Sequence, residues 1–238
     1  MSNKIAISDI HGNYIALQKL LAILGFETNF YGEYKNKNNN FLHFMGDLND
    51  YTISQGRSSL RVINIVMQLV KQGYGECLTS NHQHKLIRYL KGNNVQLTNG
   101  LNNTAAELDY CSITEKAAIL EFLKERPYYY ADTINNKNYI FAHAYFDDLM
   151  FEYSLQENKT KKKDDWFHSH CIYGPNNQEG RIKWFEDSDF DKINKFKLIV
   201  SHYHFELYKD NFAVIDNEDC LVAYDITNEK IIRVSKYE

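Results

Sequence analysis

The feature that most constrains the fold of this chain is a set of five short apolar runs that each lead into polar side chains. The runs cover residues 4–8, 41–45, 75–79, 139–142 and 197–200, and each is typical of a buried strand. The side chains that follow them are Asp9 and His11, Asp47, Asn81 and His82, His143, and His202 and His204. Because the carboxyl ends of strands form the ligand-binding edge of an open α/β sheet, we expect these scattered groups to converge.

The rest of the pattern predicts helices early in the chain and strands late in it. Helices are expected at residues 13–24, 58–71, 81–91 and 114–126. Further strands are expected at 128–133, before a long irregular region, and in a tail that reads as an antiparallel meander at 211–216, 220–226 and 231–234. This order predicts an α/β fold, a mixed sheet with helices packed outside it.

Two polar stretches are predicted to be loops. Residues 35–40 (KNKNNN) have almost nothing to bury, and residues 157–165 (ENKTKKKDD) form a charge run that we interpret as solvated.

Composition bounds the class of protein. With 238 residues, of which 44% are hydrophobic, the chain suits one domain over residues 1–238. A net charge of -4 argues against a protein that mainly coats nucleic acid, although a local basic groove stays possible. The four cysteines form no C-x-x-C pair, and no signal or membrane-spanning pattern is present. We therefore expect a reduced, cytoplasmic protein that does not enter a membrane.

The candidate ligands themselves indicate a chemistry. Carboxylate, imidazole and amide oxygen without any thiolate suit Mn, Fe or Zn in a catalytic site. Singly, each group has a structural alternative, and Asp9 and Asn81 would serve as helix N-caps. Together they exceed the needs of one ion, whereas two ions that share Asp47 would use them all. Such a site, with a hydroxide between the ions, suits in-line displacement at phosphorus.

Five ordered blocks resemble a known family. "SDIHGN", "GDLND", "SNHQ", "FAHAY" and "SHYH" are similar to the signature blocks of calcineurin-like metallophosphoesterases of the phosphoprotein-phosphatase type. The stretch Leu78–Leu108 also resembles bacterial asymmetrical bis(5′-nucleosyl)-tetraphosphatases and the phosphatase domain of bacterial polynucleotide kinase–phosphatase. The resemblance covers essentially the whole chain.

The resemblance implies a four-layer α/β sandwich with two divalent ions, manganese first and Fe, Zn, Ni or Co as alternatives, at the strand ends. It assigns Asp9 and His11 to the first metal, Asp47 to both metals, and Asn81, His143 and His202 to the second metal. It also implies that His82 protonates or stabilises the leaving oxygen and that Asp50 orients His82. Asn81 would in addition bind phosphate oxygens.

The chain departs from the family pattern at several positions. Ser8, Ser80 and Ser201 replace glycines, which we expect the turns to tolerate because serine is small. Tyr51 replaces an arginine that clamps phosphate, and offers one donor where arginine offers a fork. We expect Arg57 either to reach back into the site as a substitute or to be an exposed residue at a helix start.

Three further expectations concern the surroundings of the site. The ring of Tyr145 is expected to crowd the entrance. His204 is either a ligand of the first metal or a buried hydrogen-bonding histidine. Lys85, Arg88 and Arg181 would contact substrate or else be ordinary solvated residues.

The expected function is metal-dependent hydrolysis of phosphate esters or anhydrides by attack of a metal-bridged hydroxide. A dinucleoside polyphosphate is the first substrate that the resemblance suggests. The alternatives are a phosphorylated nucleic-acid end or 2′,3′-cyclic phosphate, a phosphoprotein, and, in another class, a degenerate phosphate-binding regulatory protein without turnover. The native metal and the oligomeric state stay open.

Overall fold

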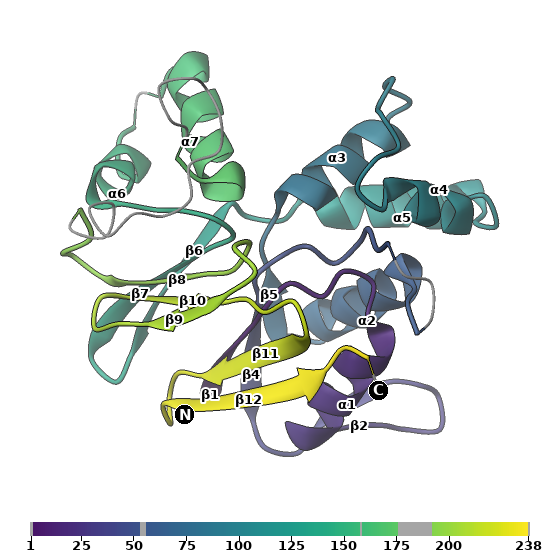
Figure 1. The fold of residues 1–238 in the computed structure, drawn as a ribbon, viewed down its shortest axis with the longest axis horizontal. Coiled ribbons are helices and arrows are strands. Elements are labelled where there is room, and N and C mark those ends of the chain that lie inside the picture. The colour runs from purple at the N-terminus through teal and green to yellow at the C-terminus, as the bar shows by residue number, and fades with distance from the viewer. Residues whose placement is uncertain (1, 53–55, 158, 176–191, 238) are drawn as a thin grey trace.

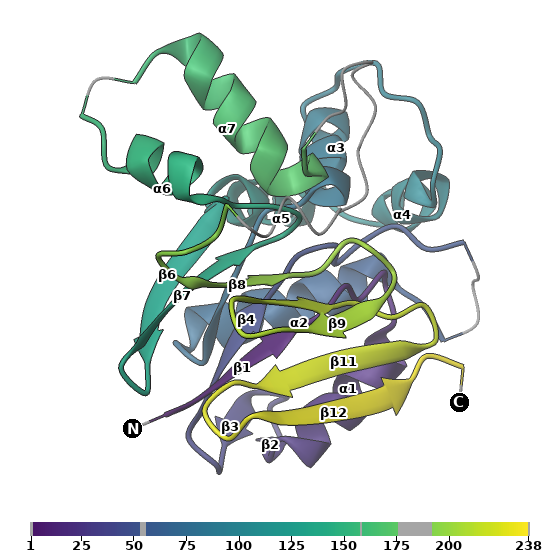
Figure 2. The same cartoon turned by 60° about the vertical axis from the view of Figure 1, so that its left-hand side comes forward.

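Two five-stranded sheets lie face to face in the computed structural model, with helices on both outer faces (Figures 1 and 2). The structure describes residues 2–52, 56–157, 159–175 and 192–237. The first sheet has the order β12 (Lys230–Ser235), β11 (Cys220–Asp225), β1 (Asn3–Ile7), β4 (Asn40–Phe44), β5 (Gly75–Cys77). The second has the order β6 (Tyr129–Ile134), β7 (Lys137–Ala142), β8 (Lys197–Val200), β10 (Phe212–Ile215), β9 (Glu206–Tyr208).

The helices divide between the two sheets. Those that share an apolar core with the outer face of the first sheet are α1 (Tyr14–Ile23), α2 (Ser59–Lys71), α3 (Asn81–Leu90), α4 (Leu101–Leu108) and α5 (Ile113–Lys124). Two others, α6 (Asp148–Ser154) and α7 (Lys161–Tyr173), pack with the second sheet. A third core joins the inner faces, so the expected four-layer order of helix, sheet, sheet and helix is confirmed.

Local sequence explains why α2 forms where it does. The hydroxyl of Ser58 caps the helix by accepting a hydrogen bond from the backbone N–H of Arg61. Its apolar residues recur at helical spacing, and Val62, Val66 and Leu69 are fully buried. Burial of each such side chain contributes about 1.5–3 kcal/mol, which anchors the helix to the first sheet.

The expected helices at 13–24, 58–71, 81–91 and 114–126 are confirmed as α1, α2, α3 and α5, with small differences at their ends. The region expected to be irregular holds α6 and α7. The charge run at 157–165 is a loop only in part, because Lys161–Asp165 opens α7. Lysine favours helices, and this helix buries only its later residues Phe167, Cys171 and Ile172, so its apolar signal lies outside the run.

Besides α6 and α7, further elements were not expected. They are α4, β9 and a hairpin of β2 (Phe26–Thr28) with β3 (Tyr34–Asn36), and β3 lies partly within the stretch 35–40 that was predicted to be a loop. Each strand of this hairpin has three residues, too few for an alternating pattern to show in the sequence.

The expected meander of the tail is wrong in part. β11 and β12 do pair antiparallel in the first sheet. β10, however, lies in the second sheet, parallel to β8 and antiparallel to β9. All four residues of β10 are buried, and a strand buried on both faces carries no alternation that would tell which neighbour it pairs with.

Parallel pairing brings the candidate ligands to one edge. β4 is parallel to both β1 and β5, and β7 is parallel to β8. The carboxyl ends of these strands therefore face the same way within each sheet, and the loops that follow them carry the polar residues. Within the described residues, no helix combines the length and the apolar character needed to cross a membrane.

Candidate metal centre

Two clusters of carboxylate and imidazole groups meet at the strand ends. His11, Asp47 and His82 form one cluster, and Asp47, His143 and His202 form the other. In each cluster the atoms able to bind a metal all lie within 4.8 Å of one another. Asp47 belongs to both, and its Oδ2 lies 3.6 Å from Nε2 of His11 and 3.6 Å from Nε2 of His143. This carboxylate is therefore placed to bridge two ions.

His11 is a candidate ligand that is held in its neutral form. Its Nδ1 lies 3.2 Å from the carbonyl oxygen of Asn49 and 3.0 Å from that of Asp50, so Nδ1 carries the proton and donates it. The lone pair of Nε2 then faces Asp47. Burial lowers the pKa of His11, which favours the neutral imidazole that a metal requires.

His143 is oriented in the same manner from the second sheet. Its Nδ1 donates to the carbonyl oxygen of Met45 at 2.9 Å, and its Nε2 lies 2.9 Å from Oδ1 of Asn81 and 3.1 Å from Nδ1 of His202. A neutral imidazole with its proton on Nδ1 presents a lone pair to the amide oxygen, an arrangement that a shared cation would satisfy. Burial lowers the pKa of His143, and burial with the neighbouring His143 ring lowers the pKa of His202 to about 3.

The surroundings of Asp9 show whether these clustered side chains suit divalent metal ions. This carboxylate is buried, and in the described part of the chain its Oδ1 has no hydrogen-bond partner. Its Oδ2 accepts a hydrogen bond from the N–H of His202 at 3.2 Å. Burial, together with the charges of Asp216 and Asp47, raises the pKa of Asp9 well above its ordinary value. A buried carboxylate oxygen without a hydrogen-bond partner, next to the two clusters, is what a divalent cation would stabilise, so the residues present fit metal ions.

The charge of Asp47 is stabilised in place. Burial alone would raise the pKa of this carboxyl, but the surrounding imidazoles, those of His82 and His143 foremost, hold it well below its ordinary value. Asp47 is therefore ionised, as a bridging ligand must be.

His82 belongs to the first cluster, and its ring is held by Asp50. Its Nδ1 donates to Oδ2 of the buried Asp50 at 2.8 Å, and its Nε2 lies 3.9 Å from Oδ2 of Asp47. The other carboxylate oxygen of Asp50 accepts a hydrogen bond from the hydroxyl of Thr104 at 2.7 Å. Burial would lower the pKa of His82, but the carboxylates of Asp47 and Asp50 outweigh it and raise that pKa.

Tyr51 does not present its hydroxyl to the metal clusters. Burial and a hydrogen bond to Glu107 raise the pKa of Tyr51 to about 12. The ring covers Gly12, where an added Cβ would lie 2.7 Å from Cδ1 of Tyr51. Arg57 does lie beside the clusters: its guanidinium donates to the carbonyl oxygen of His11 at 3.3 Å, and it lines a cavity of about 480 Å3 together with His11 and His82. Of the two expectations for Arg57, the position agrees with the one in which it reaches back.

The three serines that replace glycines each bind the backbone. Ser201 Oγ accepts the N–H of Asp9 at 3.1 Å, Ser80 Oγ accepts the N–H of Asp47 at 3.0 Å, and Ser8 Oγ accepts the N–H of Val222 at 3.0 Å. The turns persist as expected, and two of the hydroxyls hold candidate ligands. Ser80, and not Asn81, is the N-cap of α3.

Two expectations about neighbouring residues need correction. The ring of Tyr145 does not crowd the entrance, because it is buried in the core of the second sheet and its hydroxyl donates to Asp147 at 3.2 Å. His204 is not buried: its side chain is 50% exposed, with Nδ1 3.5 Å from Asp216, outside both metal clusters.

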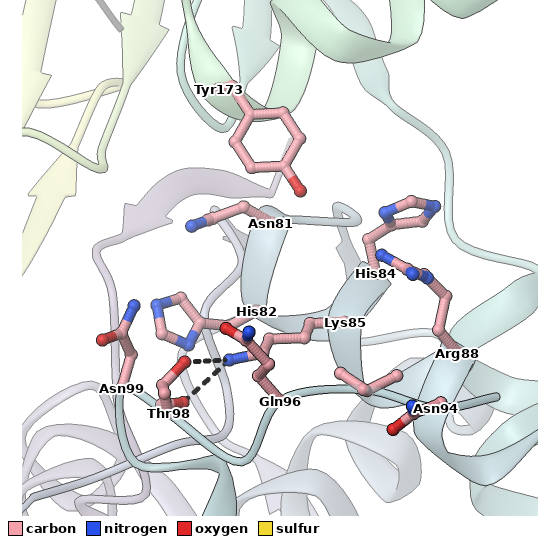
Figure 3. A pocket seen from close by; sticks show the side chains of 11 residues that line it. Asn81, His82, His84, Lys85, Arg88, Asn94, Gln96, Thr98, Asn99 and Tyr173 are labelled. Carbon is pink, nitrogen blue, oxygen red and sulfur yellow. Dashed lines mark hydrogen bonds between the residues drawn. The ribbon is translucent and has the colours of Figure 1, made fainter. Parts of the chain in front are cut away.

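Several residues near the clusters carried no sequence signal. Thr104, Asp216 and Lys236 follow no recognisable motif, yet Thr104 holds Asp50, and the charges of Asp216 and Lys236 act on Asp9. Lys85 and Arg88 line a second cavity of about 390 Å3 beside Asn81 and His82 (Figure 3). Arg181 lies outside the described residues.

Comparison with known proteins agrees with this geometry. The asymmetrical bis(5′-nucleosyl)-tetraphosphatase PrpE of Oceanobacillus iheyensis is 33% identical over 174 residues, which are 71% of this chain and 62% of that protein. The PrpE of Bacillus subtilis is 39% identical over 142 residues, 58% of this chain and 55% of that protein. The matches thus span about half to two-thirds of the relatives' length. No family model matches the chain.

Solved structures show the same fold. A putative diadenosine tetraphosphatase superposes with a TM-score of 0.61 at 18% identity, covering 98% of this chain and 93% of its own. A protein serine/threonine phosphatase from Saccharomyces cerevisiae, with similarity to human phosphatase PP5, gives a TM-score of 0.61 at 12% identity, covering 100% of this chain and 81% of its own.

Proposed function

We propose that this chain is a metal-dependent hydrolase of dinucleoside polyphosphates, because it shares the fold of solved phosphatases and is related in sequence to bacterial asymmetrical bis(5′-nucleosyl)-tetraphosphatases. The relatives' name supplies the substrate class. The observation that carries the proposal is the position of Asp47 between the two clusters, with the unsatisfied Asp9 beside them.

The proposed ligands come from both sheets. We assign Asp9 and His11 to one divalent ion, Asn81, His143 and His202 to the other, and Asp47 to both. When bound, such ions lower the pKa of a water molecule and neutralise phosphoryl oxygens. Manganese is the ion we propose first, because carboxylate, imidazole and amide ligands without thiolate suit it. The exposed His204 is not included in this ligand set.

The proposed role of His82 follows from its hydrogen bonds. Its Nδ1 proton is committed to Asp50, so the proton it can give to a leaving oxygen is on Nε2. Its raised pKa keeps that proton in place at higher pH than an ordinary histidine would. Asp50 acts through His82 by fixing the ring, and is a positioning residue.

Arg57 is proposed to replace the missing phosphate-clamping arginine. Its guanidinium reaches the backbone of His11 and lines the same cavity as His82, while the hydroxyl of Tyr51 is directed to Glu107. Since both sheets supply ligands, we also propose that residues 1–238 act as one catalytic domain. The cytoplasmic location expected from the sequence stays a prediction.

Variants at Asp47 and His82 test the proposed function. Hydrolysis of diadenosine tetraphosphate and of p-nitrophenyl phosphate with added manganese should fall by about 100-fold or more in Asp47→Asn and in His82→Ala. Asp47→Asn should also lose manganese binding measured by calorimetry. Asp109→Asn, an exposed carboxylate at the end of α4, is the matched control and should behave as the wild type.

The outcomes separate the alternatives. If neither variant differs from the wild type on either substrate, the proposed site is wrong. If the wild type binds manganese but hydrolyses neither these substrates nor phosphorylated RNA ends, 2′,3′-cyclic phosphates or phosphopeptides, the non-catalytic alternative replaces our proposal. Faster turnover of one of the other classes would keep the chemistry and change the substrate.

A further inference from the structure

A second cavity adjoins the metal clusters on the side of α3. It has a volume of about 390 Å3 and shares Asn81 and His82 with the site (Figure 3). One wall is α3, from which Lys85 and Arg88 line the cavity, and the opposite wall is the end of α7, which contributes Tyr173. The irregular segment between α3 and α4 completes it with neutral polar side chains, those of Asn94, Gln96, Thr98 and Asn99.

The charges of the two cavities beside His82 differ. Among the described residues that line the α3 cavity there are two permanent cations, Lys85 and Arg88, and no carboxylate. The cavity on the other side of His82 also holds two cations, but Asp50 and Glu218 accompany them. A part of a substrate that carries several negative charges would therefore be stabilised more in the α3 cavity.

The two cations are held differently. Lys85 Nζ donates to the carbonyl oxygen and the hydroxyl oxygen of Thr98 at 2.8 and 3.0 Å, which ties the segment between α3 and α4 to the helix. Arg88 has no carboxylate partner within the described ranges, and it is exposed. Its guanidinium is thus available to bind two oxygens of one phosphate at once.

Tyr173 narrows the cavity from the opposite side. It is half-buried, and its hydroxyl points toward Asn81 in Figure 3. The next residue, Gly174, ends α7 with φ 78°, and a Cβ there would lie 2.5 Å from the hydroxyl oxygen of Tyr203. The glycine lets the end of α7 approach this closely, which places the ring of Tyr173 over the cavity. The hydroxyl of Tyr173 is a donor for a phosphate oxygen.

We propose that the α3 cavity binds the polyphosphate chain beyond the scissile phosphate, with Arg88 and Tyr173 as specificity-determining contacts. The inference rests on the proposed function. In asymmetrical hydrolysis of a dinucleoside tetraphosphate, water adds to the phosphorus next to one nucleoside. The bond from that phosphorus to the oxygen that bridges to the next phosphorus breaks, and the leaving triphosphate oxygen takes a proton. One product then keeps a single phosphate and the other keeps three. The more highly charged product fits the cavity that holds cations without carboxylates.

Measurements of ligand binding test this inference independently of hydrolysis. Calorimetry would measure β,γ-methylene ATP, tripolyphosphate and AMP binding to the wild type, Arg88→Gln and Tyr173→Phe. We expect Arg88→Gln to weaken the ATP analogue and tripolyphosphate by about tenfold, and Tyr173→Phe to weaken them by about threefold, with a smaller effect on AMP. Lys91→Gln is the matched control, since Lys91 is an exposed cation that follows α3 but does not line the cavity.

The binding results distinguish failure of this inference from failure of the proposed function. Equal weakening of AMP and the ATP analogue, or equal effects of Arg88→Gln and Lys91→Gln, would overturn the inference. Weak tripolyphosphate binding with tight binding of the ATP analogue would show that the nucleoside, not the phosphate chain, is recognised, and would also overturn it. If the protein hydrolyses diadenosine tetraphosphate but Arg88→Gln binds normally, only this inference fails. If Arg88→Gln has the expected effect in a protein without turnover, only the proposed function fails.

Discussion

At the scale of single residues, the candidate metal centre depends on serine hydroxyls that accept hydrogen bonds from backbone N–H groups. Ser80 accepts hydrogen bonds from the N–H groups of Asp47 and Gln83, and Ser201 accepts one from Asp9. Glycine at these positions would free the chain but leave the N–H groups without these partners. Serine thus stabilises turns whose next residues must point inward.

Ser80→Ala should therefore affect both stability and activity. Loss of the N-cap and of the bond to Asp47 should lower the free energy of unfolding by about 1–2 kcal/mol, measured by urea denaturation. Manganese affinity should fall as well, because the backbone of Asp47 loses its support. Ser112→Ala removes the N-cap of α5 in the same way and should cost similar stability without changing the affinity. If the two variants change manganese affinity equally, the special role of Ser80 is refuted.

Backbone conformation explains why the site could be predicted only as a set of residue types. His11, Asp47, Asp50 and His202 all have positive φ, between 43° and 74°. Non-glycine residues rarely adopt this region, and the residue types here do not predict a positive φ. The pattern of apolar runs predicted which residues approach the edge of the sheets, but not the turns that aim Nε2 of His11 and Oδ2 of Asp47 at each other.

At the scale of elements, α4 supports His82 although no motif predicted this helix. The hydroxyl of Thr104 on α4 binds the carboxylate of Asp50 and contacts Ser59 at the start of α2 at 2.8 Å. Two helices therefore hold the carboxylate that orients His82. The sequence predicted the pair of Asp50 with His82 through resemblance. Thr104 lies in LNNTAAEL, whose buried residues do have helical spacing but extend over only eight residues.

The variant Thr104→Val tests by kinetics whether Thr104 supports His82 through Asp50. The variant keeps the shape of the side chain and removes its hydrogen bond, so kcat should fall by about tenfold with little change in KM. The alkaline limb of the pH–rate profile should move to lower pH, because a less well-held Asp50 stabilises protonated His82 less. Thr133→Val, on β6 and away from both cavities beside His82, serves as the control. A profile that does not move would leave Thr104 with a structural role only.

Helices with many apolar contacts were predictable, whereas several elements with a weak apolar pattern were not. α2 has buried residues at regular spacing and was expected within one residue of its start. β9 and the β2–β3 pair have three residues per strand and were missed. The partners of β10 were also missed, because pairing is decided by the whole sheet and a uniformly buried strand fits several neighbours.

At the scale of the whole molecule, the interface between the sheets contains an ionisable group. His43 on β4 is 2% exposed, stacks on Phe141 of β7 with 4.1 Å between ring centroids, and in the described part of the chain neither ring nitrogen has a hydrogen-bond partner. Burial, with a smaller effect of Lys4, lowers the pKa of His43 to about 3. The folded protein therefore holds this ring neutral.

His43 should make the folded protein less stable at low pH. The unfolded chain binds a proton at His43 below pH 6.5 while the folded chain does not, so stability present above pH 6.5 is lost as the pH falls toward 3. At pH 5 this loss is about 2 kcal/mol relative to pH 8. His43→Phe should reduce it, as measured by urea denaturation at both pH values. His84→Phe, at a half-buried position on α3, is the comparison variant and should reduce this loss of stability less than His43→Phe does. An unchanged pH dependence in His43→Phe would contradict the expectation.

The position of β1 has a consequence for synthesis of the chain. This strand lies between β4 and β11, and Ile5 is paired with Asp225. While the ribosome is still extending the polypeptide, one edge of β1 has no neighbour until β11 emerges, so Asp9 cannot be set in its final turn earlier. Nascent chains would therefore complete the candidate metal centre late and abruptly, and a truncation before β11 would leave an unpaired strand edge that favours aggregation.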